Sequence, residues 1–212
     1  MLYVFEELEQ IDDTIYQRML KELSSQRLEK AERYKQTNDK KQCAAAYLLL
    51  RYALMTEYNM TAEESRVEFD YIENEKPVLK NHRSIFFNMS HCIYGVACAL
   101  SQKEVGVDIQ DIRPFRMMTL ERIASAAEKE SVLHDEQPER AFCRLWSAKE
   151  CIAKLSGKGL AADFSKLKAD SNLTVWEHER YILTCSEKME TVTVTLSQLD
   201  TAFGLLSEFG QK

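Results

Sequence analysis

The chain alternates twice between stretches of helical pattern and stretches of strand pattern. A short apolar run at residues 2–8 predicts an opening strand. The stretch from there to about Tyr58 has no Gly or Pro and ends in AAAYLLLRYALM at residues 44–55, which predicts helix. Runs rich in β-branched and aromatic residues follow, separated by turn residues, and predict strands up to GVDIQ at residues 106–110.

The same order then repeats in the second part of the chain. The segment PERAFCRLWSAKECIAKLSGKG at residues 138–159 predicts a long helix that begins near Pro138 and ends at Gly157 or Gly159. Alternating apolar runs in the tail predict further strands. Helices followed by strands, twice over, indicate an α/β fold of the α+β kind with two similar halves, which we place at residues 1–102 and 103–212.

Composition narrows the class of protein. The chain is 45% hydrophobic, has no apolar run near the roughly 20 residues that span a bilayer, and lacks a basic start with an apolar leader. We therefore expect a soluble, cytoplasmic protein with no membrane partner. A net charge of −6 argues against a nucleic-acid partner, because affinity for the phosphate backbone comes from clustered Lys and Arg. The six cysteines form no C-x-x-C pair, so buried, reduced thiols are expected.

The first segment with candidate chemistry is GVDIQ. Strand alternation places Asp108 and Gln110 on one face and Val107 and Ile109 on the other. An acidic and a carboxamide oxygen on one face could ligate a hard cation such as Mg²⁺. A strand end whose Asp caps a turn explains the same residues without any function.

Other candidate segments follow the same logic. In WSAKECIAKLSGKGL at residues 146–160, Glu150 and Lys154 are neighbours on a helix surface, which is also the spacing of a common surface ion pair. FFNMSH at 86–91 ends an apolar strand with Ser90 and His91, which could hold a phosphate or simply be satisfied in a loop. The stretch 27–41 has six Lys or Arg against three acids, which fits either a solvated helix face or a seat for a phosphorylated ligand.

Taken in order, these segments resemble the 4′-phosphopantetheinyl transferase superfamily in its larger, surfactin-synthetase-activating (Sfp-like) type. That family carries G-x-D-[IV]-E, then W-[ST]-x-K-E-[AS]-x-x-K-x-x-G-x-G-[LF], with a G-[KR]-P turn and an F-N-[IL]-S-H strand upstream. Here GVDIQ, WSAKECIAKLSGKGL, EKP at 75–77 and FNMSH at 87–91 occur in the family order. The resemblance covers nearly the whole chain.

The resemblance implies a pseudo-dimeric monomer with its active site in the cleft between two similar halves. It implies holo-[acyl-carrier-protein] synthase activity: Mg²⁺-dependent transfer of the 4′-phosphopantetheine arm of coenzyme A to a serine of an apo acyl, peptidyl or polyketide carrier protein. Adenosine 3′,5′-bisphosphate would be released. The larger type is usually tied to secondary metabolite biosynthesis.

The family's roles carry over residue by residue. Asp108, Gln110 and Glu150 would ligate Mg²⁺, and Glu150, or a water that it orients, would accept the proton of the attacking serine. The phosphate next to the pantetheine would contact Lys154. The remaining predicted contacts are Arg27, Lys30, Ser90 and His91 for the adenosine 3′-phosphate, Lys76 near the nucleotide, and Leu160 for the carrier protein.

The chain departs from the family pattern at a few positions. Gln110 stands where the family has a second metal carboxylate, and a carboxamide oxygen brings no charge. Gln42 and Cys43 stand where the family has an Arg-Thr pair at the 3′-phosphate, and Glu75 replaces a glycine. These departures keep a second hypothesis open, namely a non-catalytic homologue that binds coenzyme A or a carrier protein.

Overall fold

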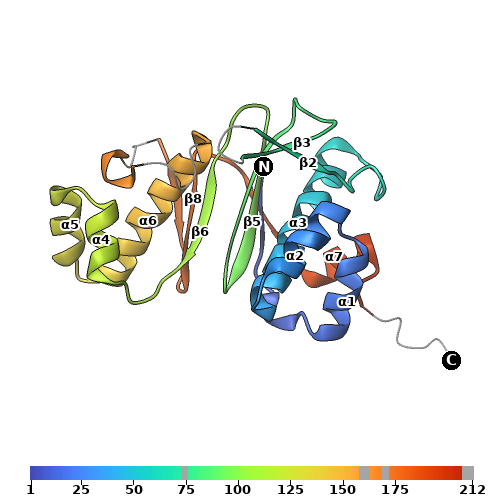
Figure 1. The fold of residues 1–212 in the computed structure, drawn as a ribbon, viewed down its shortest axis with the longest axis horizontal. Helices are drawn as coiled ribbons and strands as arrows, with labels where there is room; N and C mark the ends of the chain where they lie inside the picture. The colour runs from blue at the N-terminus through green and yellow to red at the C-terminus, as the bar shows by residue number, and fades with distance from the viewer. Residues whose placement is uncertain (73–75, 158–162, 169–171, 207–212) are drawn as a thin grey trace.

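The structure is a computed structural model that describes residues 1–72, 76–157, 163–168 and 172–206. Two sheets face each other in the middle of the molecule, and helices cover the outer face of each (Figure 1). The layers therefore run helix, sheet, sheet, helix. Within the described ranges, no helix has the length and apolar character needed to cross a membrane.

The first half combines one larger sheet and the two-stranded sheet β2–β3 with three α-helices. Its elements are β1 (Leu2–Phe5), the 3-10 helix η1 (Leu8–Gln10), α1 (Asp13–Lys21), α2 (Ser25–Arg33), α3 (Thr37–Tyr58), β2 (Phe69–Ile72), β3 (Lys76–Leu79), β4 (Phe86–Cys92) and β5 (Gly95–Ser101). The predicted helical stretch is split in three, because extended residues Asp12, Ser24 and Gln36 precede the three helices. Nearly every residue from Gln42 to Leu54 in α3 is buried, since α3 packs between β4–β5 and the other helices.

The second half repeats the plan. Its elements are β6 (Val107–Asp111), α4 (Met117–Ile123), α5 (Ala126–Leu133), α6 (Pro138–Leu155), the 3-10 helix η4 (Phe164–Lys166), β7 (Thr174–Glu177) and β8 (Tyr181–Cys185). Helix α6 begins at Pro138 as predicted and ends at Leu155. Gly157 follows at a φ of +70°, a left-handed conformation that glycine adopts at little cost and that commonly ends helices.

The duplication is visible in the strand pairing. In the first half β1 pairs with β5, and β5 pairs with β4, all antiparallel. In the second half β6 pairs with β8, and β8 pairs with β7, again antiparallel. Each half is thus one strand, a group of helices and a pair of strands whose second member lies beside the first strand. The predicted α+β class with two similar halves is confirmed.

The chain returns to the first half after β8. Strand β9 (Thr191–Val194) pairs parallel with β1, and helix α7 (Leu196–Phe203) packs on α3. Strand β9 therefore belongs to the first sheet and α7 to the helices that cover it, so residues 191–203 lie with the first half and not with the second half as predicted. The boundary near residues 102 and 103 stays a prediction.

Small and branched side chains fill the space between the two sheets. Ala97 and Ala99 of β5 pack in one buried cluster with Val107 and Ile109 of β6. Such small side chains let the two backbones approach closely. Strands β4 and β6 consequently lie side by side, and Ser90 of β4 meets Asp108 of β6 there.

Candidate active site at the seam between the halves

Helix α6 lies directly on the backbone of β6. Three side chains spaced four residues apart on α6 donate to β6 carbonyls: Cys143 Sγ to Gln110 O at 3.2 Å, Ser147 Oγ to Asp108 O at 3.3 Å, and Cys151 Sγ to Gly106 O at 3.3 Å. A Cβ on Gly106 would lie 2.2 Å from the carbonyl oxygen of Cys151. The glycine is therefore required for this close approach, which fixes Asp108 against α6.

Two hydrogen bonds join β4 of the first half to β6 of the second. The Val107 N–H donates to Asn88 Oδ1 at 3.2 Å, and Ser90 Oγ donates to Asp108 Oδ1 at 3.0 Å. Because β6 pairs with β8 along its other edge, Asn88 satisfies a backbone donor that the sheet leaves open. The seam therefore places the predicted residues Ser90 and Asp108 in direct contact.

Lys154 completes this cluster from α6. Its ammonium donates to Asp108 Oδ1 at 2.6 Å and to Ser90 Oγ at 2.8 Å. Glu150 lies one helical turn before Lys154 on the same face and is half-buried. Burial raises the pKa of the Glu150 carboxyl, the Asp108 carboxylate raises it further, and Lys154 opposes both. The structure thus brings Asp108, Glu150 and Lys154 together, although they come from different elements.

The side-chain oxygens of this cluster are suitable ligands for a divalent cation. Asp108 Oδ2 is buried and has no hydrogen-bond partner among the described residues, an arrangement that is costly unless something else binds it. Gln110 follows on the same face of β6, so a carboxamide oxygen and two carboxylates share this region. No group of three or more His, Cys, Asp or Glu in the described part of the chain could hold a metal. A cation would therefore also need Gln110, water or substrate oxygens.

A cavity of about 240 Å³ opens on the first-half side of this cluster, and we call it the cationic cavity. Arg27 and Lys30 of α2 line it together with Asn88, Ser90, His91 and Lys154. Burial and the nearby cations Lys154, Arg27 and Lys30 lower the pKa of His91 to about 4. The free cavity therefore holds a neutral imidazole among cations, and an anion bound here would favour protonation of His91.

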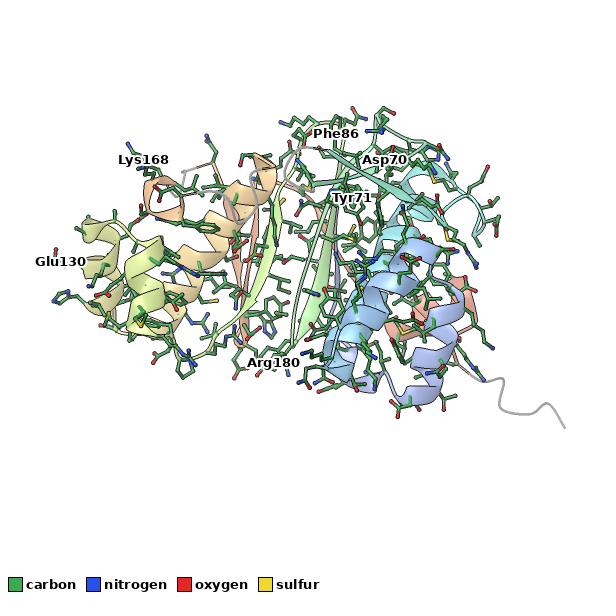
Figure 2. The ribbon with its side chains drawn as sticks, viewed as in Figure 1. Asp70, Tyr71, Phe86, Glu130, Lys168 and Arg180 are labelled. Carbon is green, nitrogen blue, oxygen red and sulfur yellow. The ribbon has the colours of Figure 1, made fainter. Side chains whose placement is uncertain are left out.

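Arg27 is anchored at the floor of the cationic cavity. Its Nη2 donates to the carbonyl oxygen of Cys43 at 3.0 Å and contacts Cys43 Sγ at 3.4 Å, while Nε is buried without a partner. Cys43 thus accepts hydrogen bonds at a position where the family pattern has a threonine. The cavity adjoins an open hollow of about 710 Å³ lined by Lys30, Arg33 and Tyr71. Tyr71, labelled in Figure 2 on the β2–β3 side, is 53% exposed.

Two predicted residues lie differently. Lys76 pairs with Glu104 and donates to the carbonyl oxygen of Leu155 at 3.2 Å, and it is not among the residues lining the cationic cavity. Its predicted role near the nucleotide stays a prediction. Leu160 lies outside the described residues.

A second hollow of about 480 Å³ reaches Gln110, which follows Asp108 on the same face of β6, and we call it the aromatic hollow. It is lined by Gln110, by residues 113–116 that lead into α4, and by Phe142 and Trp146 of α6. Phe115, Phe142, Trp146 and Phe164 form a continuous row with centroid separations of 4.4, 6.1 and 5.9 Å. Met117 and Met118 of α4 are 45% and 80% exposed nearby in the chain.

Sequence reasoning missed the residues that hold this geometry. Asn88 belongs to the FFNMSH motif, but the motif does not predict its hydrogen bond to β6, which depends on how the two sheets pack. The row Cys143, Ser147 and Cys151 carried a usable signal, because small or weakly polar residues at every fourth position of a helix favour close contact with another backbone.

Known proteins are similar to this chain over much of its length. A model of the 4'-phosphopantetheinyl transferase superfamily matches residues 104–199. The 4'-phosphopantetheinyl transferase psf-1 of Bacillus pumilus is 31% identical over 169 residues, covering 77% of this chain and 72% of the relative. The 4'-phosphopantetheinyl transferase Sfp of Bacillus subtilis is 28% identical over 147 residues, covering 68% and 65%. The 4'-phosphopantetheinyl transferase AcpT of Salmonella typhi is 36% identical over 95 residues, covering 42% and 50%.

Proposed function

The chain belongs to the 4′-phosphopantetheinyl transferase superfamily, in its Sfp-like type, and we propose how its two hollows divide the work of the reaction. The enzyme transfers the phosphopantetheine arm of coenzyme A to a serine of a carrier protein. The cationic cavity takes the nucleotide end of coenzyme A, and the aromatic hollow faces the carrier protein. The observation that carries this proposal is the cluster of Asp108, Glu150 and Lys154. Lys154 also lines the cationic cavity, and Gln110, on the same strand face as Asp108, lines the aromatic hollow.

The cationic cavity suits the 3′-phosphate of coenzyme A. Arg27 and Lys30 supply positive charge, Ser90 supplies a hydroxyl, and His91 gains a proton when an anion approaches. The buried Nε of Arg27 is an unused donor in the same place. Lys154 reaches the cavity from α6, so the phosphate next to the pantetheine lies between Lys154 and the nucleotide seat.

Asp108 and Glu150 would hold a Mg²⁺ ion, with Gln110 as a neutral third ligand. When bound, such an ion neutralises charge on the pyrophosphate oxygens. The support for this assignment is the unpartnered Oδ2 of Asp108 and the two carboxylates that face one lysine.

The residues of the chain then position and deprotonate the nucleophile. Glu150, whose pKa is raised, accepts the proton of the carrier serine hydroxyl directly or through a water. The serine oxygen forms a bond to the phosphorus next to the pantetheine, and the bond from that phosphorus to the bridging oxygen breaks. Lys154 donates to the phosphate oxygens as charge develops, and adenosine 3′,5′-bisphosphate leaves from the cationic cavity.

The carrier protein approaches over the aromatic hollow. Arg113 and Arg116 line it beside aromatic side chains and one acid, Asp111, which pairs with Arg113 at 3.5 Å. Two exposed methionines of α4 follow directly in the chain. A basic and apolar surface of this kind fits an acidic partner that presents apolar side chains around its serine. Leu160 remains our candidate contact in the segment that follows α6.

The chain acts, in this proposal, as a cytoplasmic monomer. All six cysteines are buried and unpaired, as a reducing compartment favours. Both halves of one chain supply the site, since Ser90 and Asp108 meet across the seam. No second copy is needed to complete it.

The test is intact-mass spectrometry of an apo carrier protein incubated with the chain, coenzyme A and Mg²⁺. We expect a mass gain of one phosphopantetheine arm on the carrier, and no gain when EDTA is present. If neither an acyl nor a peptidyl carrier gains mass while coenzyme A still binds, the non-catalytic binding hypothesis replaces this one. A gain that persists in EDTA would contradict the assigned cation.

A further inference from the structure

Lys149, the residue before Glu150, is a fully buried cation that the reaction does not use. Its side chain is 0% exposed, and its ammonium donates three hydrogen bonds. They go to the carbonyl oxygen of Ile123 at 2.7 Å, to Glu128 Oε2 at 2.7 Å and to the carbonyl oxygen of Phe164 at 2.9 Å. An ammonium has three donors, so all of them are satisfied.

These partners belong to three separate segments on the outer side of α6. Ile123 is the last residue of α4, Glu128 is in the first turn of α5, and Phe164 begins η4. Glu128 also closes the capping box of α5 with Ser125. Lys149 therefore ties α4, α5 and η4 to one point on α6.

The apolar core that holds these segments is small. Its buried members are Leu120, Val132 and Ala141, compared with a much larger cluster of buried side chains in the first half. A segment with little buried apolar surface depends more strongly on specific polar contacts for its position. Among the described residues, Lys149 donates hydrogen bonds to all three segments, while an ion pair of Lys129 with Glu121 at 2.6 Å joins only α5 and α4.

The same segments frame the aromatic hollow. Arg116 and Thr119, at the start of α4, line it. Phe164 stacks on Trp146 from the side of η4, with ring centroids 5.9 Å apart. Lys149 holds the carbonyl of Phe164, so it fixes the far end of the aromatic row.

We infer that Lys149 is a positioning residue for the carrier protein: it sets the spacing of α4 and η4 around the aromatic hollow and touches neither substrate. This inference rests on the proposed function of that hollow. It assigns Lys149 and Glu150, adjacent in sequence, to different tasks, since Lys149 shapes the acceptor surface and Glu150 handles the proton. Loss of Lys149 should then weaken binding of the carrier protein far more than binding of coenzyme A.

The experiment compares Lys149→Met, Glu128→Gln and the control Arg144→Met, which removes an exposed α6 cation paired with Glu177. For Lys149→Met we expect the KM for the carrier to rise about tenfold or more, while the KM for coenzyme A stays within about twofold. Glu128→Gln keeps the capping residue type but removes the charge, and a smaller rise of about threefold in the carrier KM is expected. Arg144→Met should change neither KM.

Hydrogen exchange of the free proteins gives a second readout that does not depend on turnover. Faster exchange in 117–133 and 163–168, with unchanged exchange in β4 and β5, is expected for Lys149→Met. Equal changes in both KM values, or unchanged exchange in those segments, would overturn the inference. If Lys149→Met does not fold, Glu128→Gln decides by the same criteria. A wild-type chain that modifies no carrier contradicts the proposed function instead, and the exchange result then judges the positioning role alone.

Discussion

The two hollows near the Asp108 cluster are lined by different kinds of side chain. The cationic cavity is lined by two cations from α2 and one from α6, with polar groups from β4 between them. The aromatic hollow has a floor of stacked rings from the 113–116 segment and α6. A small, strongly charged ligand and a broad protein surface need these different linings. Placing both near one cluster lets a single site join two unlike substrates.

The largest expected effect comes from removing Asp108, whose carboxylate holds the cluster together. Asp108→Ala takes away the carboxylate that Lys154 and Ser90 bind, together with the free Oδ2. We expect turnover to fall by roughly a thousandfold or more, because charge stabilisation at the phosphate is lost. Thermal unfolding should show an intact fold. Activity within tenfold of wild type would remove Asp108 from the site.

Gly106→Ala tests the close contact between α6 and β6, because the added methyl group would push these two elements apart. The new methyl group would lie 2.2 Å from the Cys151 carbonyl oxygen and 2.9 Å from the Leu155 nitrogen, and both are backbone atoms. We expect a loss of about 1–3 kcal/mol in unfolding free energy together with a fall in kcat of at least about tenfold.

The matched control is Gly95→Ala. Its methyl group would lie 2.9 Å from the carbonyl oxygen of Phe5, in a contact that does not involve α6. It should cost stability without a comparable loss of kcat. Equal losses of kcat in both variants would mean that the close contact between α6 and β6 is not what positions the site.

Lys30→Met alters the nucleotide side alone. Lys30 is exposed on α2 and lines the cationic cavity, so the fold should tolerate the change. We expect the KM for coenzyme A to rise about tenfold, with the KM for the carrier unchanged, because one cation facing the 3′-phosphate is lost. The KM for dephospho-coenzyme A should not move. An equal rise for both forms of coenzyme A would place Lys30 away from the 3′-phosphate, and Lys21→Met serves as the surface control.

The smallest expected effect is on the pH dependence of stability, and it comes from the ion pair of Glu128 with Lys149. Partial burial raises the pKa of Glu128, but hydrogen bonds from Lys149 and Ser125 outweigh it and lower the pKa below its ordinary 4.5. A lowered carboxyl pKa contributes stability above pH 4.5 that is lost as pH falls through the folded-state value. Urea unfolding should show Glu128→Gln less stable by about 1 kcal/mol at pH 7, and this difference should shrink as the pH falls below 4.5 through the folded-state pKa of Glu128. A difference that is independent of pH would contradict the ion pair.

The sequence predicts which residues carry chemistry better than it predicts contacts between residues far apart in the chain. Motif order predicts Asp108, Glu150, Lys154, Ser90 and His91 as site candidates, and the structure brings these five into one region. The helix from Pro138 and the doubled order of elements also followed from pattern. The return of 191–203 to the first half could not be predicted, because a parallel pairing between β9 and β1 joins residues about 190 apart. Lys76 shows the same limit, since its pairing with Glu104 depends on tertiary packing.

Hydrogen exchange of the wild-type chain with each substrate alone tests the division of labour most directly. Coenzyme A should slow exchange in α2 and β4, which line the cationic cavity, and leave 113–123 unchanged. An apo carrier protein should slow exchange in 113–123 and 163–168 and leave α2 unchanged. Protection of the same segments by both substrates, or the reverse assignment, would contradict the account.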